Sequence, residues 1–269
     1  METYIPVILA LGILGVMGLI FGAVLSAADK KLAVHVDPRI QQIRDYLGGA
    51  NCGACGYAGC DAFADAVVRG DAKPTGCPAS GSDAAEQIGL VMGISVERSE
   101  KVVARVICQG TSGIAKDRYD YDGYRSCVVA ASIAGGPKVC RFSCIGLGDC
   151  AQACAFGAIN MENGIARIDE KKCVGCGNCI DKCPRSAIRL LPTDHKVLVL
   201  CRNSDTGRDA RDACMKACIA CSRCVKECQY DAIIVENGFA RIDANKCTRC
   251  GACAKVCPCG CIVDFDAVE

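Results

Sequence analysis

The sequence predicts an α+β protein with one N-terminal transmembrane helix, a small helical module, and two tandem copies of a small α+β unit. Three observations predict this architecture. Residues 5–25 carry no charged side chain. A ladder of eight cysteines occurs twice with identical overall spacing, first from Cys140 to Cys183 and again from Cys214 to Cys257. The segments inside the ladders also repeat, as "AINMENGIARIDEKKC" and "AIIVENGFARIDANKC". The C-terminal half is therefore a tandem duplication, and it duplicates cysteine-rich loops.

Composition sets the first limits on function. The 269 residues suffice for one large domain or for two to three small ones. With 31 basic and 30 acidic side chains, the chain has no overall charge that would attract nucleic acid. Its 26 cysteines are the unusual feature. Such a density indicates disulfides in a secreted chain and metal binding in a reducing compartment, so the compartment has to be inferred first.

The N-terminal segment favours the reducing compartment. The uncharged stretch from Ile5 to Leu25 is long enough to cross a bilayer as a helix. Lys30 and Lys31 follow the segment and only Glu2 precedes it, which places the bulk of the chain in the cytoplasm. A cleaved signal peptide is the alternative, but its basic residues would precede the apolar core. We therefore predict an anchor at residues 1–28 in the inner, cytoplasmic membrane.

Residues 29–100 form the predicted helical module. Asp37-Pro38 opens an amphipathic helix, and helices are expected at 61–68 and 82–92. Between them lie "NCGACGYAGC" and a later Cys-Pro, which supply four thiols: Cys52, Cys55, Cys60 and Cys77. Four cysteines with a C-x2-C pair suit a structural zinc ion as well as an iron–sulfur cluster. The pattern alone leaves both open.

Residues 101–135 are predicted to connect the module to the duplicated units. "KVVARVIC" alternates as a strand does and ends at Cys108, and "DRYDYDGY" is a polar turn. Cys127 precedes Cys201 by the same interval that separates the two ladders, which suggests that this position belongs to the duplication. Cys108, Cys127, Cys201 and Cys214 are either buried small hydrophobic residues or ligands of a further metal site.

The duplicated ladder has the spacing of bacterial iron–sulfur ligands, C-x2-C-x2-C-x3-C-P. The run is complete at Cys173–Pro184 and at Cys247–Pro258, and it recurs without the proline at 218–228. The fourth run is irregular, because Leu147 occupies the position of Cys221. We therefore expect Cys140, Cys144 and Cys150 to supply three thiolates from a looser loop.

Each copy resembles a two-cluster bacterial ferredoxin, with unit 1 at residues 136–190, a linker at 191–213 and unit 2 at 214–269. In that pattern the fourth cysteine of each run ligates the other cluster. The resemblance implies four ligand sets: Cys140, Cys144, Cys150 and Cys183; Cys154, Cys173, Cys176 and Cys179; Cys218, Cys221, Cys224 and Cys257; and Cys228, Cys247, Cys250 and Cys253.

Local patterns fill in each unit. A short helix is expected after Cys154 and after Cys228, followed by a hairpin with an Asn-Gly turn at 163–164 and at 237–238. His195 lies in the polar linker and is expected to be solvated. Cys259 and Cys261 lie beside a ligand loop and are either space-filling residues, the interpretation we favour, or alternative ligands.

The whole chain resembles the B subunits of the Rnf complex family, the ion-pumping ferredoxin:NAD oxidoreductases of bacterial membranes. An anchor helix, "NCGACGYAGC", a downstream cysteine and ferredoxin-type ladders carry the resemblance. It implies a [4Fe–4S] cluster on Cys52, Cys55, Cys60 and Cys77, and thus five [4Fe–4S] clusters in all. It also implies that electrons come from a soluble ferredoxin and pass to membrane and flavin-bearing subunits of a complex that exports Na⁺ or H⁺.

The residues themselves predict an electron-transfer protein without catalytic side chains. The chain has no nucleotide-binding glycine fingerprint, no P-loop and no recognisable catalytic triad. Two other classes remain open: an electron-carrier subunit of another membrane hydrogenase or reductase, and a structural zinc protein. Arg202, Arg208, Arg211 and Lys216 form a basic stretch that either docks an acidic ferredoxin or is simply a solvated face.

Overall fold

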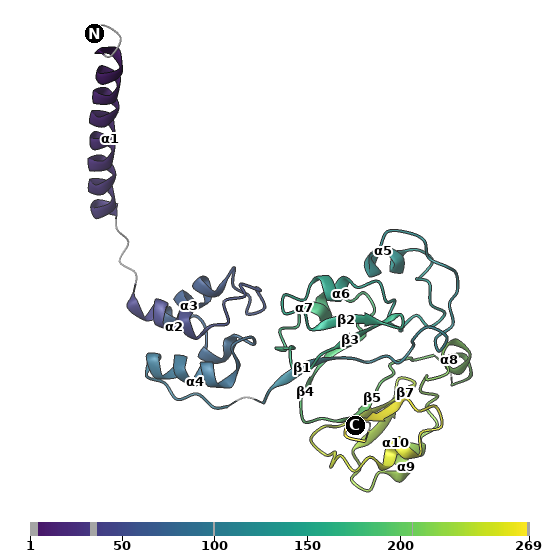
Figure 1. Ribbon diagram of the computed structural model, residues 1–269. Coiled ribbons are helices and arrows are strands. Elements are labelled where there is room, and N and C mark those ends of the chain that lie inside the picture. The colour runs from purple at the N-terminus through teal and green to yellow at the C-terminus, as the bar shows by residue number, and fades with distance from the viewer. Residues whose placement is uncertain (1–4, 33–36, 99, 206, 268–269) are drawn as a thin grey trace.

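The computed structural model describes residues 5–32, 37–98, 100–205 and 207–267, which form a long helix, a helical module and two small α+β units (Figure 1). The helices are α1 Ile5–Leu32, α2 Pro38–Tyr46, α3 Cys60–Arg69, α4 Gly81–Met92, α5 Cys127–Ser132, α6 Asp149–Gln152, α7 Asn178–Asp181, α8 Gly207–Ala213, α9 Arg223–Glu227 and α10 Ala252–Lys255, with a 3-10 turn η1 at Pro74–Gly76. The strands are β1 Val102–Val106, β2 Ile159–Glu162, β3 Ile165–Ile168, β4 Ile188–Pro192, β5 Val197–Val199, β6 Ile233–Glu236, β7 Phe239–Ile242 and β8 Ile262–Asp264.

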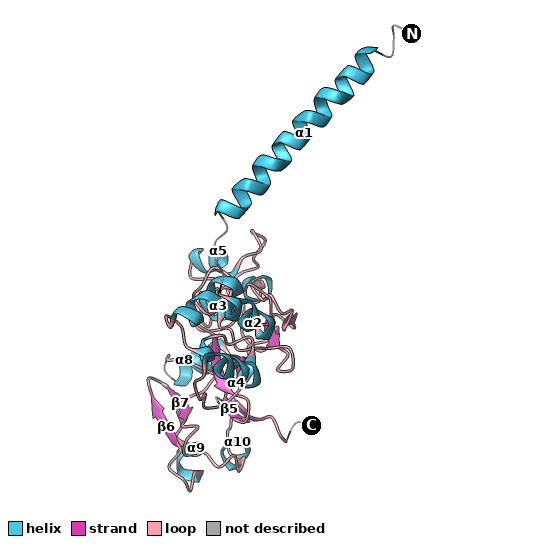
Figure 2. Ribbon diagram, turned by 90° about the vertical axis from the view of Figure 1, so that its left-hand side faces the viewer, coloured by secondary structure: helices cyan, strands magenta, loops and turns pink. Residues whose placement is uncertain are grey.

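Helix α1 stands apart from the rest of the protein in Figures 1 and 2. Its segment Leu11–Asp29 has a mean hydropathy of 2.2 and is long and apolar enough to cross a membrane. Large apolar side chains along it, such as Leu19 at 77 % exposure, have no protein partner in the described part of the chain. The predicted apolar helix is confirmed, and it continues to Leu32, beyond the expected end.

The helical module forms as its turn signals predict. The Asp37 side chain accepts a hydrogen bond from the Arg39 N–H (2.9 Å) and so caps α2, whose first residue is Pro38. Helices α2, α3 and α4 bury Ile43, Phe63 and Ile88 between them. Leu47 and Tyr57 attach the loop at 47–59 to this core.

The two predicted hairpins form with the same register. In β2/β3 Ile159 lies opposite Ile168, and in β6/β7 Ile233 lies opposite Ile242. Both Asn-Gly turns have two consecutive residues with positive φ, at 47° and 79° in the first and 53° and 86° in the second. These are the angles that a two-residue turn demands and that asparagine and glycine tolerate.

Two further strand pairs complete the units. Strand β1, expected in the connector, pairs antiparallel with β4 of unit 1. Strand β5, expected in the linker, pairs antiparallel with β8 of unit 2. The connector and the linker thus each contribute an edge strand, so both units begin earlier in the chain than the cysteine pattern suggests.

The short helices lie before Cys154 and Cys228, not after them as predicted. Helix α6 ends at Gln152 and α9 ends at Glu227, and in both units a turn follows the cysteine. The next strand begins at Ile159 in unit 1 and at Ile233 in unit 2, which leaves room for a turn and none for a helix.

The β1/β4 and β5/β8 sheets meet at a seam between the units, and Ile107, Leu198 and Leu200 are buried there. The buried Arg105 side chain spans the seam. It pairs with Glu170 of unit 1 (Nη1–Oε1 2.7 Å), and its guanidinium lies 4.7 Å from the ring centroid of Phe265 in unit 2. The seam therefore combines apolar packing with a charged contact.

His195 lies at this seam and is 6 % exposed, so the expectation of a solvated side chain was wrong. A turn closed by the His195 N–H and the Pro192 carbonyl (3.1 Å) leads the chain from β4 back into β5. Neither ring nitrogen has a hydrogen-bond partner within the described ranges. Burial lowers the His195 pKa, which favours the neutral imidazole.

Candidate cysteine-lined metal centres

The module presents its four predicted cysteines to one cavity. Cys52, Cys55, Cys60 and Cys77 line it, and its empty volume is about 340 Å³. The loop turns sharply around the cavity because residues 51, 53 and 56 adopt positive φ. The Asn51 side chain accepts a hydrogen bond from the Cys60 N–H (2.8 Å), which ties the loop to the start of α3.

Unit 1 contains a second such cavity, of about 330 Å³, lined by Cys154, Cys173, Cys176 and Cys179. Strand β1 closes one side of it. A Cβ on Gly175 would lie 2.5 Å from the Val102 carbonyl oxygen, so the ligand loop and the strand approach as closely as only glycine allows. The Ala104 N–H of the same strand donates to Cys173 Sγ (3.3 Å).

Unit 2 contains two cavities that match its predicted ligand sets. Cys218, Cys221, Cys224 and Cys257 line one of about 340 Å³, with Cys259 and Cys261 also in its wall. Cys228, Cys247, Cys250 and Cys253 line another of about 320 Å³. Together with the cavities of the module and unit 1, the structure brings together four of the five predicted sets, each around its own space.

The geometry of these cavities fits a cluster better than a single ion. No group of three or more His, Cys, Asp or Glu side chains among the described residues is arranged to hold one metal ion. Each cavity is instead a larger space lined by at least four cysteines. Backbone N–H groups point at several of these sulfurs, as with Ala158 to Cys154 (3.4 Å) and Ala240 to Cys218 (3.4 Å). Such N–H···S bonds stabilise the thiolates of iron–sulfur clusters.

Burial shapes the thiol chemistry before any metal binds. It raises the pKa of Cys179 to about 12 and that of Cys253 to about 11. Without metal, these two thiols are therefore neutral at pH 7, and cluster binding must release their protons. Cys257 differs, because a hydrogen bond from the Cys261 thiol lowers its pKa to about 5. The two sulfurs lie 3.5 Å apart.

The fifth predicted set, Cys140, Cys144, Cys150 and Cys183, is divided in the structure. Cys144, Cys150 and Cys183 lie in the core of unit 1. Burial raises the pKa of Cys140, and the thiols that add to this increase are those of Cys108 and Cys214.

Cys127 lies close to the vacated position in unit 1. Burial raises the pKa of Cys150, and the Cys127 thiol adds more to this increase than the Cys183 thiol does. Leu147, which replaces the usual ligand of this run, packs against the small cluster that contains Cys127.

Asp149 fixes Cys127 in this place. Its carboxylate accepts hydrogen bonds from the Cys127 N–H (2.9 Å) and the Ser126 hydroxyl (2.9 Å), which ties the start of α5 to the residue before Cys150. Burial alone would raise the Asp149 pKa, but these hydrogen bonds lower it.

A further cavity of about 300 Å³ lies between the units and is lined by four cysteines, Cys108, Cys140, Cys201 and Cys214. From the sequence, three of them (Cys108, Cys201 and Cys214) are expected to be either buried small hydrophobic residues or ligands of a further metal site. One pattern could have linked two of them: "VIC" ends at Cys108 and "VLC" at Cys201, each directly after an edge strand. The period of the duplication concealed this match, because it pairs Cys201 with Cys127 instead.

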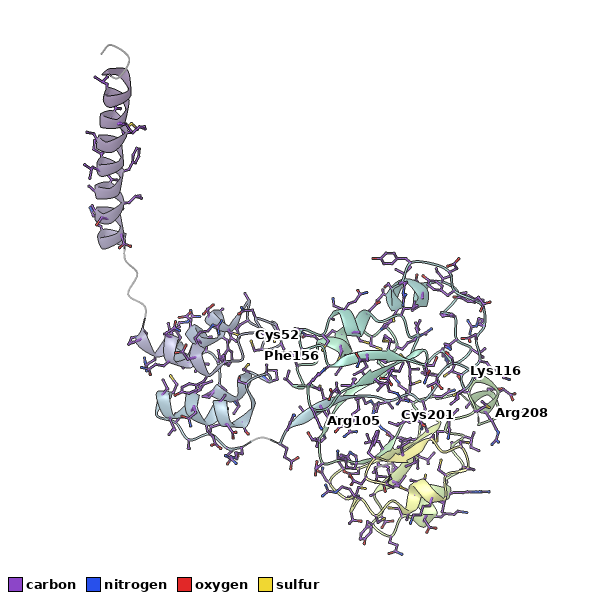
Figure 3. The ribbon with its side chains drawn as sticks, in the orientation of Figure 1. Cys52, Arg105, Lys116, Phe156, Cys201 and Arg208 are labelled. Carbon is purple, nitrogen blue, oxygen red and sulfur yellow. The ribbon has the colours of Figure 1, made fainter. Side chains whose placement is uncertain are left out.

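The module and unit 1 meet at their cysteine loops. The Asn178 side chain donates to the Cys52 carbonyl oxygen (3.3 Å). Burial raises the pKa of Cys176, and the nearby Cys52 thiol adds to this increase. A hydrogen bond from the Asn178 backbone N–H acts in the other direction and lowers the pKa. Figure 3 shows Cys52 on the side of the module that faces unit 1. The first cavity therefore lies next to the second.

Family models match three parts of the chain. An Fe-S cluster family matches residues 47–79, a 4Fe-4S binding domain matches residues 166–189, and a 4Fe-4S dicluster domain matches residues 214–258. The three regions contain many of the cysteines that line the cavities.

Curated relatives match nearly the whole chain. The B subunit of the Na⁺-translocating ferredoxin:NAD⁺ oxidoreductase complex of Acetobacterium woodii is 45 % identical over 95 % of this chain and 77 % of the relative. The B subunit of the ion-translocating oxidoreductase complex of Methanosarcina acetivorans is 41 % identical, covering 93 % and 95 %. The B subunit of the proton-translocating ferredoxin:NAD⁺ oxidoreductase complex of Clostridium ljungdahlii is 42 % identical, covering 95 % and 92 %.

Proposed function

The chain belongs to the family of B subunits of ion-translocating oxidoreductase complexes, and from this premise we propose that it accepts electrons from reduced ferredoxin and passes them to the other subunits. It is an iron–sulfur electron-transfer subunit of a ferredoxin:NAD⁺ oxidoreductase complex. The observation that carries the proposal is the series of separate cavities in the module and both units, each lined by the four cysteines of one predicted ligand set.

Five [4Fe–4S] clusters are proposed, with one change in the ligand sets. Four sets are kept: Cys52, Cys55, Cys60 and Cys77; Cys154, Cys173, Cys176 and Cys179; Cys218, Cys221, Cys224 and Cys257; and Cys228, Cys247, Cys250 and Cys253. In the fifth, Cys127 replaces Cys140 beside Cys144, Cys150 and Cys183, because Cys127 neighbours Cys150 and Cys140 lines another cavity. When bound, each cluster supplies one-electron redox chemistry.

The protein's own residues would position and tune these centres. The cysteine thiolates hold them, the backbone N–H groups that donate to sulfur raise their potentials, and buried apolar side chains around the loops exclude water. Since cluster ligation supplies part of the folding energy of such small units, loss of a ligand should affect both binding and stability.

The proposed electron path ends at the membrane side of the chain. Unit 2 or unit 1 would receive electrons from ferredoxin, and the module, which joins the anchor helix, would release them to membrane and flavin-bearing partners. The contact between Asn178 and Cys52 supports the last step, because it brings the module's ligand loop against the loop of unit 1. The proposed location is the cytoplasmic face of the inner membrane, with α1 as the single span.

Removal of the module's cluster tests this direction. In the full complex, Cys55→Ala should leave reduction of the clusters in both units by ferredoxin unchanged and abolish electron transfer onward to the partner subunits. Cys259→Ala, which removes a cysteine outside every proposed ligand set, is the matched control. Undiminished transfer in Cys55→Ala would refute the proposed exit.

The basic residues of α8 are the proposed docking site for an acidic ferredoxin. Arg208 and Arg211 are exposed on this helix, whereas the Arg202 guanidinium is bound to the carbonyls of residues 185 and 186. Reversing both exposed charges should slow reduction by ferredoxin and flatten its salt dependence, while Arg69→Glu in the module should do neither. An unchanged salt dependence would remove this docking site.

A further inference from the structure

The cavity between the two units is built symmetrically from them. Unit 1 contributes Cys108 and Cys140, and unit 2 contributes Cys201 and Cys214. Its volume of about 300 Å³ is close to that of the other cysteine-lined cavities. Its four cysteines stand on four different segments, so only the assembled pair of units brings them together.

Hydrogen bonds show that Cys108 and Cys201 hold equivalent positions. The residue before Cys108 donates its N–H to the Ala187 carbonyl (2.7 Å), and the residue before Cys201 donates to the Cys261 carbonyl (2.7 Å). Ala187 and Cys261 themselves occupy matching places in the two copies, each at the same distance past the Cys-Pro that closes its ladder. Each unit thus directs one cysteine from the end of its edge strand into the shared cavity.

The sulfurs of these two cysteines accept backbone hydrogen bonds. Cys108 Sγ accepts from the N–H of Gly110 (3.3 Å) and Cys144 (3.4 Å). Cys201 Sγ accepts from the N–H of Asn203 (3.5 Å) and Cys218 (3.3 Å). A buried hydrophobic cysteine needs no such donors, whereas a cluster-bound thiolate is stabilised by them.

Polar side chains also converge on the cavity. Asn203 is only 1 % exposed, and its side-chain amide points at Cys140 Sγ (3.6 Å). Arg202 and Lys216 also line the cavity. Donors and cations placed around four thiols offset the negative charge of a thiolate-ligated cluster.

We propose that Cys108, Cys140, Cys201 and Cys214 bind a sixth [4Fe–4S] cluster that joins the two units. The proposal rests on the electron-transfer function above. It also places the new cluster: Cys144 and Cys218, proposed ligands of one cluster in each unit, donate their N–H groups directly to its ligand sulfurs. An electron can then pass from unit 2 to unit 1 through this centre, and from there to the module.

Counting clusters on the anaerobically purified full-length chain tests the proposal. Native mass spectrometry, together with iron and acid-labile sulfide per chain, should give six clusters and about 24 iron atoms. Cys214→Ala and Cys201→Ala should each lose one cluster, or about 4 iron. Because both residues serve one cluster, the double variant should lose no more than either single variant. Cys259→Ala should keep all six.

The outcomes separate this proposal from the function it rests on. Five clusters on the wild-type chain, unchanged in Cys214→Ala, would overturn the sixth site and leave the electron-transfer function standing. Zinc without sulfide would overturn both. If an alanine variant loses most of its iron by misfolding, the wild-type count and the EPR spin count of the fully reduced protein still decide between five and six.

Discussion

Units 1 and 2 descend from one duplicated pattern, yet they differ in how their cysteines reach the metal centres. The shared parts are local. Both hairpins have the same register and the same Asn-Gly turn, and the loops at 173–183 and 247–257 have the same spacing. The differing part is the entry to each unit. The segment from Cys108 to Cys140 is much longer than the equivalent segment from Cys201 to Cys214, so unit 1 contains an insertion before its ladder.

The insertion compensates for a change in the ladder itself. Unit 1 has Leu147 at the position of Cys221, and its longer entry includes α5 with Cys127 at the first position. Arg185, where unit 2 has Cys259, donates a hydrogen bond to the Gly135 carbonyl of the same insertion. Under the proposed ligand sets, the inserted segment supplies the thiol that the ladder of unit 1 lacks, while the shared fold is kept.

The largest expected effect breaks this compensation. Cys127→Ala should remove one cluster from unit 1, a loss of about 4 iron per chain, because it takes away the fourth thiolate. Adding Leu147→Cys to the same chain should restore the cluster, since it recreates the spacing of unit 2. Iron and sulfide analysis of the three proteins measures both changes.

Cys140→Ala is the matched control for that experiment. It should also cost one cluster, but Leu147→Cys should not restore it, because Cys140 lines the cavity between the units. Full iron content in Cys127→Ala, or rescue of Cys140→Ala by Leu147→Cys, would return Cys140 to the set that the sequence predicts for unit 1.

The next effect concerns the edge strands, where unit 1 has a charged pair and unit 2 does not. When the two copies are aligned, Leu198 of unit 2 is equivalent to Arg105 of unit 1, and Ala244 is equivalent to Glu170. Arg105→Leu should destabilise the seam by about 2 kcal/mol, since it leaves the half-buried Glu170 with Lys196 as its one remaining ion-pair partner among the described residues. Arg105→Leu with Glu170→Ala should recover most of the loss.

Thermal loss of the clusters, followed by visible absorbance, measures this effect for both variants. Glu170→Ala alone serves as the control, because it leaves the buried guanidinium without its carboxylate and should also be destabilising. Equal stability of the double variant and Arg105→Leu would show that the lost packing on Phe265, and not the unpaired carboxylate, is what matters.

Sequence reasoning succeeded where the determinants are local and failed where they are not. The Asn-Gly hairpins and the Asp37-capped helix follow from turn chemistry, and the structure forms each of them. Four of the cysteine sets follow from short spacing, and the structure places the cysteines of each set around one cavity, while their role as cluster ligands stays a prediction. Cys127, Cys140 and His195 depend on how distant segments pack. The repeat period of the two cysteine ladders cannot reveal an insertion between an edge strand and the ladder that follows it. The polar composition of the linker cannot reveal that the linker packs at the seam between the units.

A smaller effect is expected at Cys261, which stands where unit 1 has Ala187. Its thiol lies 3.5 Å from Cys257 Sγ and donates to that sulfur when Cys257 is a thiolate. Cys261→Ala should lower the potential of the adjacent cluster by about 40 mV, the equivalent of one hydrogen bond of about 1 kcal/mol. An EPR-monitored redox titration measures the shift, with Cys259→Ala as the control. An unchanged potential would make Cys261 the filler that its sequence position suggested.

The smallest effect is expected at His195, which occupies the place of Val102 in the other edge strand. Burial lowers its pKa, and nearby Arg105 and Arg249 add to this effect while Asp194 opposes it. Below a pH of about 6.5 the imidazole is protonated in the unfolded chain but stays neutral in the folded chain. This residue therefore lowers the stability of the folded state as the pH falls through that value. His195→Val should leave cluster-loss temperatures nearly unchanged at pH 8 and raise them relative to wild type at pH 5.5. A difference that does not change between the two pH values would show that packing alone, without the imidazole's protonation, distinguishes the two strands at this position.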